Sequence, residues 1–208
     1  MTMLRQRRST PQARGLQNRR RMLEAARKLL ETHDLRDIAL ADVAEAAGVA
    51  TSSAYHFYAD MEELLTHLQT RIQGELIDIV LRPLRQPVAS WQDVISRLNG
   101  RGVRFYNSDA AARQLQIGPR IPPELKMRDR RSDAAIGSAY EQHVGRHFVL
   151  PALPQRSQIF FRAVEIADLM FCLSLMDDSS ITAEMQAEAG RACIAYLGTY
   201  LPVTLPRR

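Results

Sequence analysis

Cysteine is scarce in this chain of 208 residues, and long apolar runs are absent. The two cysteines, Cys172 and Cys193, lie in apolar stretches with helical spacing, so we expect buried free thiols rather than a disulfide or a redox switch. The basic start is not followed by an apolar run of signal-peptide length, and no stretch approaches a membrane span. These absences favour a cytoplasmic protein without a membrane partner.

Strand-like alternation of apolar and polar residues is also missing, as are internal repeats and low-complexity tracts. Apolar residues instead recur at three- and four-residue intervals, which predicts an all-α protein. Because 46% of the residues are apolar, the chain can bury a full core, either as one domain or as a small domain joined to a larger one.

The usual signatures of enzymes are absent too, including a glycine-rich phosphate loop and a nucleophile elbow. His143 and His147 have the i, i+4 spacing of zinc ligands, but no glutamate lies between them and no third ligand is evident. The paired carboxylates Glu165 and Asp168 are explained most simply by an ion pair of Glu165 with Arg162. We therefore expect no catalytic residue, metal or cofactor. A cleft with an ordered metal, or with a carboxylate pair of shifted pKa, would favour an enzyme.

Positive charge, by contrast, is concentrated at one end of the chain. The net charge of +5 is modest, yet residues 1–28 hold nine basic side chains and one acid, Glu24. The basic residues are Arg5, Arg7, Arg8, Arg14, Arg19, Arg20, Arg21, Arg27 and Lys28. This distribution is typical of a protein with a polyanionic partner, although a solubilising tail is the alternative.

The segment that follows predicts a helix-turn-helix. Its first helix, residues 40–47, has apolar residues at i, i+3, i+4 and i+7, and Gly48 ends it in a tight turn. A second short helix begins at about Thr51 and carries small or hydrogen-bonding side chains on its leading face. In a helix-turn-helix this second helix enters the DNA major groove.

A third helix precedes the motif. It is expected from about Asn18 to His33, with one apolar face that packs on the other two helices. Residues 1–16 show no periodic face and are expected to form a flexible basic arm that contacts phosphates or a minor groove. We therefore predict an arm at 1–16, a DNA-binding domain at 17–59 and a larger domain at 60–208.

The run IAL-ADVAEAAGV-ATSSAYHFYADMEELL, with RRRMLEAARKLLE ahead of it, resembles the N-terminal domain of the TetR (tetracycline-repressor-like) family of bacterial transcriptional regulators. Three helices and both turns agree in order and spacing. The chain departs from the family at Ala39, where Ser or Thr is usual, at the end of the third helix, and at Met61, where a phosphate-contacting Lys is usual. The resemblance thus implies the docking mode but not the usual phosphate contacts.

By resemblance, we assign DNA contacts to side chains of the arm, the first helix and the third helix. They are Arg14, Arg19, Arg20, Thr51, Ser52, Ser53, Tyr55, His56 and Tyr58. Hydroxyl groups can donate to or accept from bases, and methyl groups can contact thymine. For Tyr58 a position in the core is an equal alternative, and for His56 the alternative is an exposed helix residue without a DNA contact.

The remainder of the chain reads as helices separated by prolines. Asp60 and Glu63 resemble a capping box, and the apolar series after them carries a helix to about Leu81. Later helices are expected near residues 90–105, 109–117 and 123–148.

The last two helices, about 155–176 and 182–201, are expected to form a homodimer. The first of them is apolar almost all the way round, so it needs cover on several sides. Two such terminal helices can pair with their symmetry mates as a four-helix bundle, which is also what the TetR resemblance implies.

The resemblance further implies a cavity for a small-molecule effector among the middle helices. Candidate lining residues are Trp91, Arg101, Phe105, Tyr140, Phe161 and Glu165. Aromatic residues at this spacing can equally be core, and the arginines at 97, 101 and 104 can be a solvated face. The sequence thus predicts a dimeric repressor that binds double-stranded DNA and is released from it by a small molecule. The alternatives are a regulator controlled by a partner protein or without an effector, and an all-helical small-molecule enzyme.

Overall fold

The computed structural model describes residues 11–85 and 87–208. In this part of the chain the regular elements are helices, as predicted, and an isolated antiparallel bridge pairs Phe148 with Arg207. No helix there is both long enough and apolar enough to cross a membrane. The chain divides into two compact units, with the division between Leu68 and Gln69.

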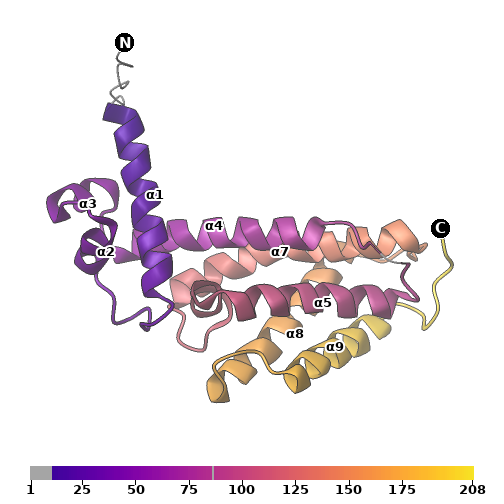
Figure 1. Ribbon diagram of the computed structural model, residues 1–208. Helices are drawn as coiled ribbons and strands as arrows, with labels where there is room; N and C mark the ends of the chain where they lie inside the picture. The colour runs from indigo at the N-terminus through magenta and orange to yellow at the C-terminus, as the bar shows by residue number, and fades with distance from the viewer. Residues whose placement is uncertain (1–10, 86) are drawn as a thin grey trace, which may run out of the picture. The chain divides into compact units, whose positions relative to one another are not determined.

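The N-terminal unit is built on α1 (Pro11–Leu29), α2 (Leu40–Ala47) and α3 (Thr51–Phe57), followed by the start of α4 (Met61–Leu81) (Figure 1). Helix α1 packs on α2, and α2 packs on α3. Their inward faces form a small core of fully buried apolar side chains: Met22, Ala26, Leu30, Leu40, Val43, Ala44, Ala54 and Leu64.

Helix α1 begins at Pro11, seven residues before the predicted start at Asn18. Proline is favourable in the first turn of a helix, because it lacks only an N–H that has no partner there. Gly15 lies inside this helix, near Phe57 of α3, whose ring would be 3.8 Å from a Cβ added at Gly15. Residues 11–16 of the predicted arm are therefore helical, whereas residues 1–10 lie outside the described residues.

The start of α4 has the predicted capping box. The Asp60 carboxylate accepts a hydrogen bond from the Glu63 N–H at 2.8 Å, and the Glu63 carboxylate accepts from the Ala59 N–H at 2.6 Å. Helix α2 has only half of such a box, because Ala39 has no side-chain acceptor. Asp42 accepts from the Ala39 N–H at 2.8 Å, which partly replaces the missing Ser or Thr.

The C-terminal unit is a helical bundle in which α5 packs on α7 and α9, α7 on α8, and α8 on α9 (Figure 1). The elements are α5 (Trp91–Ser108), α6 (Ala110–Ala112), the π-helical turn η1 (Arg113–Ile117), α7 (Pro123–His147), α8 (Arg156–Asp177) and α9 (Ala183–Gly198). These bounds confirm the helices expected from the proline breaks. Where α7 meets α8, an added Cβ at Gly137 would lie 2.7 Å from the Phe161 Cα, so only glycine permits this close approach.

Candidate nucleic-acid interface and ligand sites

Helix α3 presents a polar, uncharged face. Thr51, Ser52, Tyr55 and His56 are exposed, Ser53 is half-buried, and Tyr55 has 56% of its surface accessible. Ala54, fully buried, anchors the opposite face of the same helix. The structure therefore leaves the predicted base-contacting side chains of α3 free in the isolated chain.

The turn before α3 is held by backbone geometry. Gly48 has φ 61° and ψ 39°, in the left-handed region, where a side chain is strained. Its N–H donates to the Glu45 carbonyl, and the Val49 N–H donates to the Ala44 carbonyl, both at 2.9 Å. This pair of bonds is a Schellman motif, which ends α2 and sets where α3 begins.

Tyr58 does not belong to this face. Its side chain is only 2% exposed and its ring packs edge-on against His67, with ring centroids 5.6 Å apart. Burial raises the pKa of its phenol. Of the two alternatives for Tyr58, this burial favours a core residue over a DNA contact, because the extended residue that ends α3 turns its side chain inward.

The predicted arginines of α1 are exposed. Arg14, Arg19 and Arg20 all have accessible side chains. The guanidinium of Arg19 lies 5.7 Å from the centroid of the Tyr58 ring, and Arg20 forms an exposed ion pair with Glu24 at 3.5 Å. They give the N-terminal unit a set of mobile cations beside its helix-turn-helix.

The aromatic effector candidates serve as core in the C-terminal unit. Trp91 is 1% exposed and its Nε1–H donates to the Pro202 carbonyl at 2.9 Å. Tyr140 is 5% exposed and its hydroxyl donates to Asn99 Oδ1 at 2.8 Å, while Phe105 is buried edge-on against Tyr106. Each already has partners within the bundle.

The candidates on α8 lie at its packing surface with α7. Phe161 is half-buried where α7 crosses α8. Glu165 pairs with Arg130 of α7 at 3.0 Å, rather than with Arg162 as the i, i+3 spacing predicts. This ion pair joins two helices, which a short-range spacing rule cannot anticipate.

Arg101 and His143 together satisfy the carbonyls at the end of α4. The Arg101 guanidinium donates to the carbonyls of Val80 and Pro83, each at 2.9 Å, and also to that of Arg82 at 2.5 Å. His143 Nε2 lies 2.8 Å from the Val80 carbonyl, so its tautomer carries the proton on Nε2. His143 is thus used in capping, not as half of a zinc pair with His147.

Arg101 also lines a surface pocket of about 750 Å³. The lining residues are Arg82, Pro83, Leu84, Arg85, Ser96, Arg97, Gly100, Arg101, Arg104 and Gln186, with five arginines and no acid among them. Burial lowers the pKa of Arg101, and so does the charge of Arg104 and Arg82. A second, smaller pocket of about 290 Å³ lies between the ends of α7 and α8, near Glu141 and Arg156.

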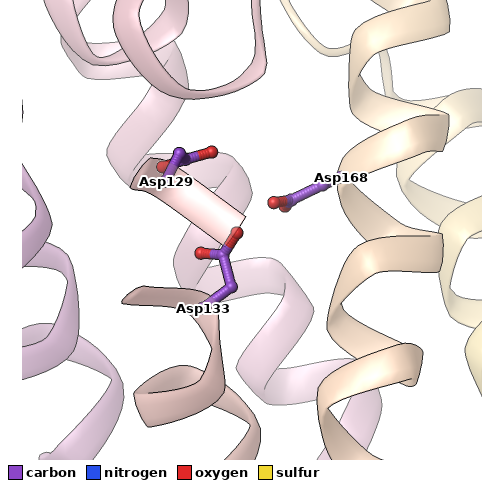
Figure 2. Close-up of side chains that lie close together, drawn as sticks. All are labelled: Asp129, Asp133 and Asp168. Carbon is purple, nitrogen blue, oxygen red and sulfur yellow. The ribbon is translucent and has the colours of Figure 1, made fainter. Parts of the chain in front are cut away.

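A cluster that the sequence did not predict lies inside the C-terminal unit. Asp129 and Asp133 of α7 face Asp168 of α8 (Figure 2), and one oxygen of each lies within 4.8 Å of the others. Burial raises the pKa of Asp129 to about 6 and of Asp168 to about 8, and it raises that of Asp133 well above its usual value. The i, i+4 spacing of the two acids beside an apolar helix face was the available signal.

Residues 22–68 match the model of a family described as "Bacterial regulatory proteins, tetR family". No curated protein matches the chain. Among solved structures, the chain is similar to a TetR-family transcriptional regulator from Streptomyces coelicolor, with a TM-score of 0.68, 19% identity, and 88% of this chain and 99% of the other covered.

Two further structures show the same fold. A TetR transcriptional regulator from Rhodococcus sp. RHA1 gives a TM-score of 0.63 at 19% identity, over 88% of this chain and 97% of the other. SmeT, the repressor of the Stenotrophomonas maltophilia multidrug efflux pump SmeDEF, gives 0.63 at 14% identity, over 89% and 91%. The fold of the chain is therefore that of the TetR-family structures, and residues 22–68 match the family model.

Proposed function

We propose that this chain, whose N-terminal domain belongs to the TetR family, is a cytoplasmic homodimeric repressor. In this proposal it binds a near-palindromic operator and is released by a small molecule. The observation that carries the DNA part is the exposed, uncharged face of α3 inside the segment that matches the family. The repressor role is supported by the likeness to SmeT, which is itself a repressor.

DNA reading is proposed for Thr51, Ser52, Ser53, Tyr55 and His56. Their hydroxyl and imidazole groups can both donate and accept hydrogen bonds, which suits base edges in a major groove. Arg14, Arg19 and Arg20 would supply salt-sensitive phosphate contacts. These arginines take the place of the usual Lys near position 61, where this chain has Met61.

The homodimer is proposed through α8 and α9. Leu169, Leu173 and Met176 are 56%, 40% and 63% exposed in the single chain, and their i, i+4, i+7 spacing places them on one face of α8. Such an apolar stripe on a small chain supports a self-complementary interface. A dimer would hold two α3 helices at the spacing of successive major grooves, about 34 Å.

The effector part of the proposal is supported by the arginine-lined pocket near the end of α4. Of the five guanidinium groups that line it, Arg97 is paired with Asp93 and Arg101 donates to backbone carbonyls. The other three, without an acidic lining residue, favour an anionic ligand over a neutral or cationic one. Arg82, Arg85 and Arg104 are exposed and can meet a carboxylate or phosphate from solvent. Because this pocket adjoins the last turn of α4, an anion there could act on the helix that leaves the DNA-binding unit.

The test is the binding of the purified full chain to DNA from the upstream region of its own gene. Fluorescence anisotropy at about 50 and about 200 mM salt should give a specific complex that weakens steeply with salt. A scrambled duplex of equal length is the control. Equal affinity for both duplexes would contradict the proposal.

Substitution of Tyr55 tests the reading face directly. We expect Tyr55→Ala to lower operator affinity by about tenfold or more, because an exposed contact to a base or phosphate is lost. Met127→Ala is the control, since Met127 is also exposed but lies on α7, outside both α3 and the proposed dimer helices. Sedimentation should show the same assembly for Tyr55→Ala as for the unchanged chain.

The alternative regulators differ at the pocket. If the regulator has no effector, or is controlled by a partner protein, no anionic compound should release the chain from DNA. Arg85→Ala and Arg104→Ala should then behave like the unchanged chain. An enzyme would need a substrate to reach the three aspartates, but these are 2%, 2% and 7% exposed and line neither of the two pockets described above. The arrangement therefore favours the regulator.

A further inference from the structure

Three aspartate side chains lie between α7 and α8, although carboxylates are rarely buried in the interior of a helical bundle (Figure 2). Asp129 and Asp133 are each 2% exposed and Asp168 is 7% exposed. Their carboxylate oxygens lie within 4.8 Å of one another. Carboxylates buried this close together repel one another and have lost most of their hydration, so they need compensation.

The cations nearby compensate only part of this charge. Lys126 Nζ lies 2.8 Å from Asp129 Oδ2, which neutralises one carboxylate. Arg130 is paired with Glu165 at 3.0 Å, so that these two cancel. With three aspartates and one lysine, the cluster has a formal excess of two negative charges when its carboxyls are ionised.

Hydrogen bonds do not complete the cluster either. In the described residues one oxygen of each aspartate is buried without a partner: Asp129 Oδ1, Asp133 Oδ2 and Asp168 Oδ2. When the carboxyls are ionised these three atoms are acceptors, so the ionised cluster lacks a donor or a cation.

Gln116 is held against the cluster at both of its ends. Its side-chain amide donates to Gln73, whose own amide donates to Asp133 at 3.2 Å. Its backbone carbonyl accepts from Lys126 at 2.8 Å, the same ammonium that binds Asp129. The side chain is fully buried and belongs to η1, a π-helical turn of the kind that is frequent at functional sites.

We propose that Asp129, Asp133 and Asp168 form a binding site for one hard divalent cation, such as Mg²⁺, Mn²⁺ or Ca²⁺. Oxygen-only donors select hard cations over zinc or copper. Metal–oxygen bonds of about 2.1–2.4 Å bring ligand oxygens to within about 4.8 Å of one another, which matches the observed cluster. A charge of +2 also balances the excess.

An organic cation fits the observations less well. An amine with its carbon skeleton needs a cavity, whereas a metal ion needs only the space that the converging oxygens enclose. Neither of the two pockets described above is lined by the three aspartates. The sequence analysis expected no metal, so this proposal differs from it. The proposal does not depend on the proposed DNA binding.

The experiment uses the full chain, freed of metal by a chelator, with Mn²⁺ as the probe. Electron paramagnetic resonance of free Mn²⁺ should show one ion bound per chain, and Mg²⁺ or Ca²⁺ should displace it. Asp168→Asn keeps the side-chain shape but removes a charged ligand, so the Mn²⁺ affinity should fall by about tenfold or more. Asp177→Asn, an exposed position at the end of the same helix, should leave the affinity unchanged.

Asp133→Asn provides a second variant, and circular dichroism checks that each variant is folded. The proposal is overturned if the unchanged chain retains no Mn²⁺, or if a folded Asp168→Asn or Asp133→Asn chain binds it as tightly as the unchanged one. It is also overturned if the polyamine spermidine raises the melting temperature and Mn²⁺ does not. Operator binding is measured separately, so failure here leaves the regulator proposal standing.

Discussion

A single glycine fixes the turn of the helix-turn-helix. At Gly48 the left-handed backbone is strained for any L side chain, and an added Cβ would lie 2.8 Å from Arg21 Nη2. Because the Arg21 side chain can move away, the cost of a substitution lies mainly in the backbone. We expect Gly48→Ala to lower the free energy of unfolding of the N-terminal unit by about 1–2 kcal/mol.

Gly74 is the matched control for this prediction. It is exposed inside α4, its φ is not positive, and an added Cβ would meet nothing within 4 Å. Gly74→Ala should therefore raise stability by about 0.5–1 kcal/mol, as expected for alanine inside a helix. Chemical denaturation followed by circular dichroism measures both changes. If both variants were stabilised, the left-handed strain at Gly48 would be disproved.

Tyr55 and Tyr58 test the difference between an exposed and a buried aromatic residue. Because Tyr58 is buried, we expect Tyr58→Phe to leave operator affinity within about twofold, whereas loss of a base or phosphate contact costs about 1–3 kcal/mol. Fluorescence anisotropy measures the affinity. A tenfold weaker complex would mean that the Tyr58 hydroxyl reaches DNA after all.

The sequence predicted the exposed face of α3 but left the position of Tyr58 open between core and DNA contact. Helical periodicity assigns faces within a helix, and Thr51 to His56 lie within one. Tyr58 comes after the last helical residue, in extended backbone, where periodicity no longer fixes the direction of a side chain. The direct contacts of Arg101 and Glu165 were missed for a similar reason, because their partners lie far away in the sequence.

At the scale of elements, His143 at the last turn of α4 makes the stability of the folded chain depend on pH. The last carbonyls of a helix have no partner in the helix itself, and here His143 and Arg101 supply donors. Burial lowers the pKa of His143, and the charges of Arg146, Arg101 and His147 lower it further. The neutral imidazole is therefore the form that the folded chain prefers.

The sign of the pH dependence follows from this shift. Since the pKa of His143 is lower in the folded chain than the unfolded value of about 6.5, the unfolded chain binds the proton first as the pH falls. The stabilisation is fully present above about pH 6.5 and is lost as the pH falls toward the folded pKa, by at most about 1.4 kcal/mol per pH unit.

His143→Gln isolates this contribution, because glutamine keeps an amide donor but does not titrate. Between pH 7.5 and pH 5, roughly the range in which histidine titrates, the unchanged chain should lose more stability than His143→Gln. The buried aspartates contribute equally to both chains, so they cancel in the comparison. If the free energy of unfolding changed with pH equally in both chains, the pKa of His143 would be the same in the folded and unfolded chain.

Element boundaries were predictable where proline or a capping box marks them. Proline residues bracket α7, and Asp60 with Glu63 marks the start of α4. The start of α1 was missed because Gly15 lowers helix propensity and residues 11–16 show no periodic apolar face. The carboxylate cluster was missed because it needs the pairing of α7 with α8, which periodicity alone does not specify.

At the scale of the whole molecule, the dimer proposal rests on the exposed stripe of α8. Leu169→Glu places a charge on this stripe, at its first residue, so we expect the chain to become monomeric in sedimentation experiments at micromolar concentration. Burying an unpaired carboxylate in an interface is strongly unfavourable. Operator affinity should fall together with assembly, because a single α3 helix contacts only one half-site.

Met127→Glu is the control for that substitution. Met127 is 53% exposed on α7, so the same charge there should leave both assembly and operator affinity unchanged. A Leu169→Glu chain that remains dimeric would place the dimer interface elsewhere. Equal loss of assembly in both variants would indicate general destabilisation instead.

The chain has one tryptophan, Trp91, which is buried in the C-terminal unit and donates a hydrogen bond to the Pro202 carbonyl. Its intrinsic fluorescence therefore reports on the local environment of Trp91. It should change when the last residues detach from α5, and not when the helix-turn-helix alone unfolds. A melting curve recorded by tryptophan emission and one recorded by helical ellipticity need not coincide. Any gap between them would measure how independently the two units unfold.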